Sequence, residues 1–169
     1  AGYDIIGKTI TIMGAGGAAS AICAQAALDG VRKIHLFARP TSRFWDRTVQ
    51  LADTITRTTS CQALLHEHQD QAALKDALSE SALLVNATSV GMAPNTEGTI
   101  LPDTSLLHPD LIVSDIIYNP RETRLLAEAK AAGCRTFNGM YMLLYQGAEA
   151  FRLWTGREMP VDVIKTKYF

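Results

Sequence analysis

A glycine-rich segment near the N-terminus contains the residue types that hold a dinucleotide phosphate. Residues 14–19 read Gly-Ala-Gly-Gly-Ala-Ala and fit the pattern G-x-G-x-x-G/A. Gly14 permits a tight turn from strand to helix, Gly16 lets a pyrophosphate approach the backbone, and Ala19 allows close packing of helix on strand. The free N–H groups and the dipole at the helix start then attract the anion. A purely structural turn is the alternative, but the strand pattern before the glycines and the helix pattern after them favour dinucleotide binding.

The segment after the next apolar run indicates which dinucleotide is bound. An NAD site usually places Asp or Glu there, where the carboxylate holds the ribose hydroxyls. Residues 37–43 instead read Phe-Ala-Arg-Pro-Thr-Ser-Arg, with no acid. The guanidinium groups of Arg39 and Arg43 match the geometry of a 2′-phosphate. We therefore predict NADP as the cofactor, with NAD as the alternative if both arginines are merely solvated surface residues.

Apolar runs and helical patterns alternate along the chain and predict a parallel sheet. Strands are expected at 8–13, 34–37, 61–65, 83–86, 111–117 and 134–137, and helices at 18–28, 44–57, 71–78, 140–154 and 161–168. Another helix is expected with Asn119 as its cap, Pro120 in its first turn and Gly133 at its end. The strand runs are continuously apolar, which is typical of a sheet covered on both faces. The predicted fold class is α/β, a Rossmann-like doubly wound parallel sheet of roughly six strands, with residues 1–169 as a single domain.

The composition argues against several classes of partner. The 169 residues include 16 Lys and Arg against 17 Asp and Glu, whereas proteins that bind nucleic acids usually show a basic excess. No apolar run approaches the ~20 residues of a membrane span, and the start has no signal-peptide pattern. Three widely spaced cysteines form no disulfide framework. We expect a cytoplasmic protein with no nucleic-acid or membrane partner, and a fragment or processed chain, because the first residue is not Met.

Other polar residues have less specific signals. His66 and His68 lie two apart without a third ligand, so a solvated loop is favoured over a metal site and no metal is predicted. His35 is expected to be a core or edge residue with no functional role. Asp115 lies near the end of the strand expected at 111–117, where α/β folds place functional groups, although it could equally hold a nearby loop.

Several segments together resemble a known family. They are residues 14–18, 86–92 (Asn-Ala-Thr-Ser-Val-Gly-Met), 115–120 (Asp-Ile-Ile-Tyr-Asn-Pro), 138–148 (Asn-Gly-Met-Tyr-Met-Leu-Leu-Tyr-Gln-Gly-Ala) and 151–156. With these segments the chain resembles the C-terminal, cofactor-binding domain of the shikimate dehydrogenase family, including its shikimate/quinate branch. The resemblance implies reversible hydride transfer between shikimate, or quinate, and NADP in aromatic amino acid biosynthesis.

The resemblance also implies roles for individual residues. The glycine segment would hold the pyrophosphate, the loop after residue 37 the adenosine ribose, and later segments the nicotinamide. Ala38 and Pro40 replace the Asn and Thr of the family's usual Asn-Arg-Thr-x-x-Arg loop. Tyr118 and Gln146 match residues that touch the substrate. The implied cofactor-binding residues are Gly14, Ala15, Gly16, Gly17, Ala18, Ala38, Arg39, Thr41, Arg43, Thr88, Ser89, Ile116, Tyr118, Asn119, Gly139 and Met142.

The same resemblance places the family's catalytic Lys–Asp pair, and most substrate contacts, in a separate N-terminal domain. Nothing in these 169 residues matches that domain. We therefore predict no catalytic residue in this chain and expect it to bind the cofactor without turnover alone. Loss of a partner domain would expose apolar surface, which favours association, for example as a homodimer. The alternatives are the Rossmann domain of another oxidoreductase and a non-catalytic, dinucleotide-binding regulatory module.

Overall fold

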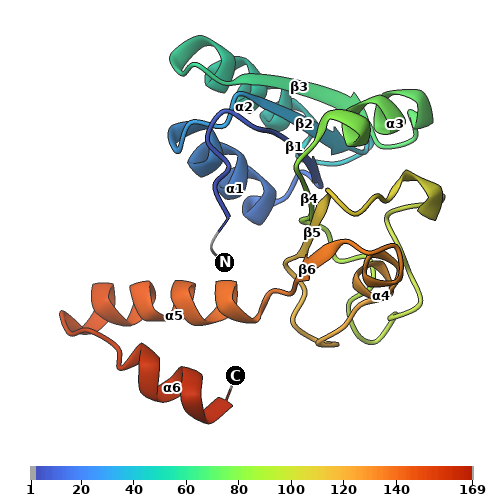
Figure 1. The fold of residues 1–169 in the computed structure, drawn as a ribbon. Helices are drawn as coiled ribbons and strands as arrows, with labels where there is room; N and C mark the ends of the chain where they lie inside the picture. Colours follow the sequence, from blue (N-terminus) through green and yellow to red (C-terminus); the bar gives the residue numbers. More distant parts are fainter. Residues whose placement is uncertain (1–2, 169) are drawn as a thin grey trace.

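Six parallel strands form one sheet in the computed structural model, which describes residues 3–168. They run in the spatial order β3-β2-β1-β4-β5-β6 (Figure 1). This is the doubly wound order, in which the direction of strand addition reverses between β1 and β4. The strands are β1 (Thr9–Met13), β2 (Lys33–Ala38), β3 (Gln62–Glu67), β4 (Leu83–Asn86), β5 (Ile112–Asp115) and β6 (Arg135–Phe137). The predicted fold class is confirmed.

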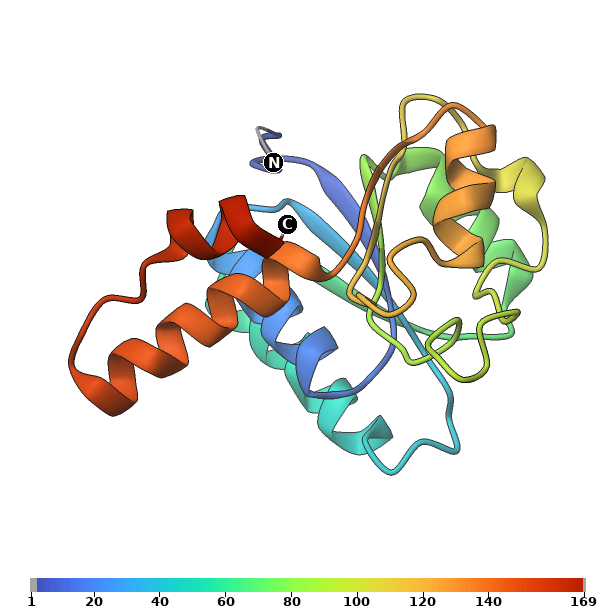
Figure 2. The same ribbon diagram turned by 90° about the horizontal axis from the view of Figure 1, so that it is seen from below.

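Helices cover both faces of this sheet, as the continuously apolar strands predict. Figure 2 shows α1 and α2 on one side of the strands and α3 and α4 on the other. Alternate strand residues build the two cores: Ile34 packs with Cys23 of α1, whereas Phe37 packs with Leu74 of α3. The helices are α1 (Gly17–Leu28), α2 (Trp45–Thr58), α3 (Gln71–Glu80), the 3-10 turn η1 (Thr104–Leu106), α4 (Arg124–Ala131), α5 (Met140–Thr155) and α6 (Val161–Tyr168).

The last two helices project from the edge of the sheet near β6 (Figure 1). Although α5 has 16 residues, Leu144 is its one buried residue, and Trp154 is 85% exposed. Apolar side chains also remain exposed on α6, including Val163. None of the helices in residues 3–168 has the length and apolar character that a membrane span requires.

One helix, α4, begins several residues away from its predicted start, whereas the starts of α1 and α2 differ from their predictions by a single residue. The segment from Asn119 does not begin a helix, because α4 begins at Arg124 with Thr123 as its N-cap. The Thr123 hydroxyl accepts from the Leu126 N–H and also donates to the buried carboxylate of Asp115. A tertiary contact with the end of β5 therefore fixes the cap, and the local Asn-Pro pattern does not reveal that contact.

Candidate dinucleotide-binding site

The glycine segment makes a tight turn at the carboxyl end of β1. Gly14 has φ +128°, a conformation that residues with a side chain rarely adopt. A Cβ on Gly14 would lie 2.6 Å from the Ala87 carbonyl oxygen, so the loop after β4 leaves no room for a side chain. The Gly14 N–H donates to the Phe37 carbonyl of β2 at 2.8 Å. The turn is thus fixed between two neighbouring strand ends.

The start of α1 is open and uncapped. Gly16 is the N-cap residue, without a side chain to bond the first N–H groups, and no acidic residue lies in the first turn. A Cβ added at Gly16 or Gly17 would meet nothing within 4 Å. Exposed N–H groups at the positive end of a helix dipole form an anion site. The residues at this turn therefore fit the phosphate of a dinucleotide.

The loop after β2 places two arginines on the surface at the same sheet edge. Ala38 is 3% exposed and is the last residue of the strand, so its methyl group is buried rather than facing a ligand. Arg39, Thr41 and Arg43 are all exposed. The Arg39 carbonyl accepts from the Ser42 N–H, which makes a turn, and the Arg43 guanidinium lies 4.7 Å from the centre of the Phe44 ring. Both cations are accessible to a phosphate.

A buried amide organises the loop after β4. The side-chain oxygen of Asn86 accepts from the Thr88 N–H at 3.0 Å and from the Thr88 hydroxyl at 2.7 Å. The hydroxyl of Thr88 in turn accepts from the Val90 N–H. Ser89 remains exposed at the tip of this loop. Thr88 thereby lies beside Gly14, because a Cβ added to Gly14 would lie 3.3 Å from Thr88 Cγ2.

A buried carboxylate organises the loop after β5. Asp115 has no exposed surface and accepts from the Asn86 amide, the Ile117 N–H and the Thr123 hydroxyl. Burial raises the pKa of Asp115, and these hydrogen bonds oppose that rise by stabilising the ionised form. Of the two roles left open by the sequence, the geometry favours the one in which Asp115 holds nearby loops.

The end of β6 approaches the same loop very closely. A Cβ on Gly139 would lie 1.8 Å from the Ile116 carbonyl oxygen, and the Gly139 N–H donates to the Ile117 carbonyl at 2.9 Å. Gly139 is therefore required by a backbone approach and is also the residue before α5. Ile116 and Gly139, two predicted neighbours of the nicotinamide, are thus brought together.

Other predicted site residues lie on the surface. Tyr118 is 45% exposed and Met142 is 40% exposed, while Asn119 and Gln146 are also exposed. The Gln146 amide donates to the Leu143 carbonyl of its own helix. These side chains stand outside the buried network, so their roles toward cofactor and substrate stay predictions.

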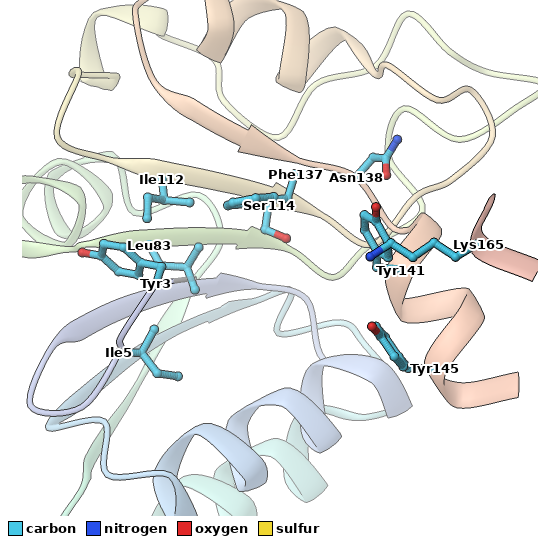
Figure 3. A pocket seen from close by; sticks show the side chains of 10 residues that line it. All are labelled: Tyr3, Ile5, Leu83, Ile112, Ser114, Phe137, Asn138, Tyr141, Tyr145 and Lys165. Carbon is cyan, nitrogen blue, oxygen red and sulfur yellow. The ribbon is translucent and has the colours of Figure 1, made fainter. Parts of the chain in front are cut away.

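A separate cavity of about 460 Å³ lies on the sheet face beside α5. Figure 3 shows Tyr141 and Tyr145 of α5 on one side of it and Leu83 and Ile112 of the sheet on the other. None of its lining residues belongs to the predicted cofactor-binding set, so it is distinct from the glycine turn. The lining residues are Tyr3, Ile5, Leu83, Ile112, Ser114, Phe137, Asn138, Tyr141, Tyr145 and Lys165.

A network of polar side chains joins β2, β3 and α3, and no local sequence pattern predicts it. His35 Nδ1 lies 2.9 Å from His66 Nε2, and His35 Nε2 lies 2.6 Å from Glu80, which also pairs with Lys33. The interpretation of His66 as a solvated loop residue is wrong, because it is a strand residue whose ring stacks on Phe37. Within residues 3–168, no group of three or more His, Cys, Asp or Glu side chains could hold a metal ion.

The sequence of this chain is similar to a known family model and to curated proteins. The family model for the shikimate 5′-dehydrogenase C-terminal domain matches residues 139–166. The chain is 50% identical over 169 residues to the shikimate dehydrogenase (NADP(+)) of Listeria innocua, covering all of this chain and 58% of that protein. It therefore spans less than two thirds of the length of this curated relative.

Solved structures agree with the curated relatives. Shikimate 5-dehydrogenase from Listeria monocytogenes, in complex with shikimate and NAD, superposes with a TM-score of 0.92 at 49% identity, covering 99% of this chain and 58% of that one. Quinate dehydrogenase from Corynebacterium glutamicum, in complex with NAD, gives a TM-score of 0.80 at 32% identity, with 95% and 54% covered. The predicted resemblance is confirmed.

Proposed function

We propose that this chain, which belongs to the shikimate dehydrogenase family as a C-terminal domain, binds NADP across the carboxyl edge of its sheet. The observation that carries the proposal is the start of α1, where Gly16 leaves backbone N–H groups uncapped beside open space. A pyrophosphate is the group that such a helix start binds in doubly wound folds. Residues 1–169 then act as one dinucleotide-binding domain with two C-terminal helices.

Bound NADP would supply the hydride chemistry that reversibly oxidises a secondary alcohol such as shikimate. In this proposal the turn from Gly14 to Ala18 holds the pyrophosphate, and Arg39 and Arg43 hold the 2′-phosphate. The loops after β4, β5 and β6 border the nicotinamide, and Tyr118 and Gln146 reach the substrate. The backbone of Ala38, rather than its buried methyl group, faces the ribose.

Substrate oxidation also needs a base for the hydroxyl proton. We assign no such base to this chain and place it in the part of the enzyme that lies outside the matched 58% of the Listeria relative. The chain alone is expected to bind cofactor without turnover. Shikimate is the proposed substrate, with quinate as the alternative, and a cytoplasmic homodimer is the proposed cellular form.

Calorimetric titration of the chain with NADP and with NAD, at one ionic strength, tests the cofactor proposal. Arg39→Ala is expected to weaken NADP binding about tenfold or more, because it removes a charge-assisted hydrogen bond to the 2′-phosphate. Arg57→Ala is the matched control, since Arg57 is equally cationic but lies in the last turn of α2. Equal affinity for both cofactors would refute the arginine argument, and binding of neither would refute cofactor binding by the chain.

A further inference from the structure

Two buried polar residues join neighbouring strand ends beneath the candidate site. Asn86 ends β4 and Asp115 ends β5, and the two are direct partners in the parallel register. Neither has any exposed surface, and the Asn86 amide donates to the two Asp115 carboxylate oxygens at 3.2 and 3.1 Å. Burying a carboxylate is costly, whereas two apolar side chains could fill the same space without that cost. The pairing of the strands alone therefore does not explain these residues.

Each of the two side chains also ties down one loop. Asn86 bonds the backbone N–H and the hydroxyl of Thr88 as well as the Val90 carbonyl. Asp115 accepts from the Ile117 N–H at 3.0 Å and from the Thr123 hydroxyl at 2.8 Å. The Asn86–Asp115 contact is therefore a bridge between the loop after β4 and the loop after β5.

The two bridged loops continue to opposite ends of the site. The loop after β4 lies against the phosphate turn, since Ala87 leaves no room for a Cβ on Gly14. The loop after β5 lies against Gly139, whose N–H bonds the Ile117 carbonyl at the start of α5. A connected path of contacts thus runs from the glycine turn to α5, and the buried pair is its central link.

We propose that Asn86 and Asp115 are positioning residues that set the spacing between the phosphate-binding and nicotinamide-binding halves of the dinucleotide site. The inference rests on the proposed function, because it assumes that NADP lies along this path. Neither residue touches the cofactor, since both are fully buried. They act through Thr88 on one side and through Ile117 on the other.

Asp115→Asn tests the bridge with almost no change in size. An amide at position 115 has one acceptor oxygen, so its NH₂ group must face one of the donors from Asn86, Ile117 or Thr123. The two loops then separate, and the nicotinamide half is expected to lose its alignment with the phosphate half. The phosphate half keeps its own contacts at Gly14 and α1.

Two ligands separate these halves in a titration of the 169-residue chain. NADPH contains both halves, whereas 2′,5′-ADP contains the adenosine with its 2′- and 5′-phosphates and lacks the nicotinamide nucleotide with the second phosphate of the pyrophosphate. Asp115→Asn is expected to weaken NADPH binding about tenfold and to change the affinity for 2′,5′-ADP by less than about twofold. Asp103→Asn is the matched control, because Asp103 caps the 3-10 turn and should leave both affinities unchanged.

Circular dichroism would reveal whether Asp115→Asn folds. If it does not, a milder pair of variants at Thr123 tests the same bridge. Thr123→Val removes the hydroxyl that bonds Asp115, and Thr123→Ser keeps it. Valine should selectively weaken NADPH binding, and serine should restore it. A purely structural role would instead lower the melting temperature without separating the two ligands.

The outcomes distinguish a failure of this inference from a failure of the proposed cofactor binding. Failure of the unmodified chain to bind either ligand would overturn both. Binding of both ligands, with the bridge variants weakening them equally or not at all, would overturn the inference and leave cofactor binding intact. Equal affinity of the unmodified chain for NADPH and 2′,5′-ADP would also overturn it, because no nicotinamide half would then be held.

Discussion

Gly139→Ala is expected to destabilise the chain strongly, because the new methyl group has no space. Its Cβ would lie 1.8 Å from the Ile116 carbonyl oxygen and 2.4 Å from the Ile116 carbonyl carbon. Real Cβ contacts essentially never fall under 3.0 Å, so one of two backbone segments must move by about 1.2 Å. Overpacking of this kind costs about 1–3 kcal/mol. The movement also breaks the hydrogen bond from Gly139 to Ile117, which adds about 1 kcal/mol.

Gly147, inside α5, provides a control for which the expected change in stability has the opposite sign. A Cβ on Gly147 would meet nothing within 4 Å, and Gly147 lies inside the helix rather than before it. Alanine is more favourable than glycine in a helix interior by about 1 kcal/mol. Gly147→Ala is therefore expected to stabilise the chain, although it adds the same methyl group to the same segment.

Thermal unfolding followed by circular dichroism measures both changes. One kcal/mol corresponds to about 2–4 °C in a domain of this size, so Gly139→Ala should lower the melting temperature by about 10 °C. Gly147→Ala should raise it by about 3 °C. A Gly139→Ala chain that melts within about 2 °C of the unmodified chain would refute the steric reasoning. A lower melting temperature for Gly147→Ala would refute the assignment of that position to an open helix interior.

Three further expectations follow from buried or open positions. Gly16→Ala should fold normally, because its Cβ meets nothing, yet weaken NADPH binding about tenfold by filling the space above the helix start, as titration would show. Burial raises the pKa of Cys23 to about 12, so its thiol should react with Ellman's reagent only after unfolding. Burial and the neighbouring His35 lower the pKa of His66, so the His66 imidazole binds a proton more readily in the unfolded chain than in the folded chain. The free energy of unfolding in urea should therefore fall as the pH drops below 6.5, and His66→Gln should reduce that dependence.

Local patterns were enough to predict the elements whose residues carry their own signal. The apolar run of β4 was predicted with its observed bounds, Leu83–Asn86, and the positive φ at Gly30 agrees with a glycine that ends α1. The predicted start of α4 was wrong. Asn119 and Pro120 have a strong local preference for the beginning of a helix, whereas the observed cap, Thr123, also bonds Asp115. A local sequence preference decides where a helix begins only if no tertiary contact stabilises a different N-cap residue.

The polar interactions were harder to predict because they join residues far apart in the sequence. His35 and His66 belong to different strands, and their pairing depends on the register of β2 with β3. The position of Asp115 at a strand end leaves its role open between function and holding a nearby loop, because its partners Asn86 and Thr123 become neighbours only in the folded chain. A sequence gives the positions of such groups along the strands, whereas the hydrogen bonds depend on how the strands are paired.

The two most constrained glycines of the site differ in the same way: one has a local sequence signal, and the other depends on a tertiary contact. Gly14 belongs to a motif with a known mechanism, and its positive φ and its contact with Ala87 agree with the predicted tight turn. Gly139 has an ordinary φ of −75° and no local pattern that requires glycine. The requirement comes from the backbone of Ile116 and Ile117, and the Ile117 N–H is itself bonded to Asp115. The need for glycine at position 139 is therefore linked to the buried Asp115 carboxylate through the loop after β5, which Asp115 holds at the Ile117 N–H.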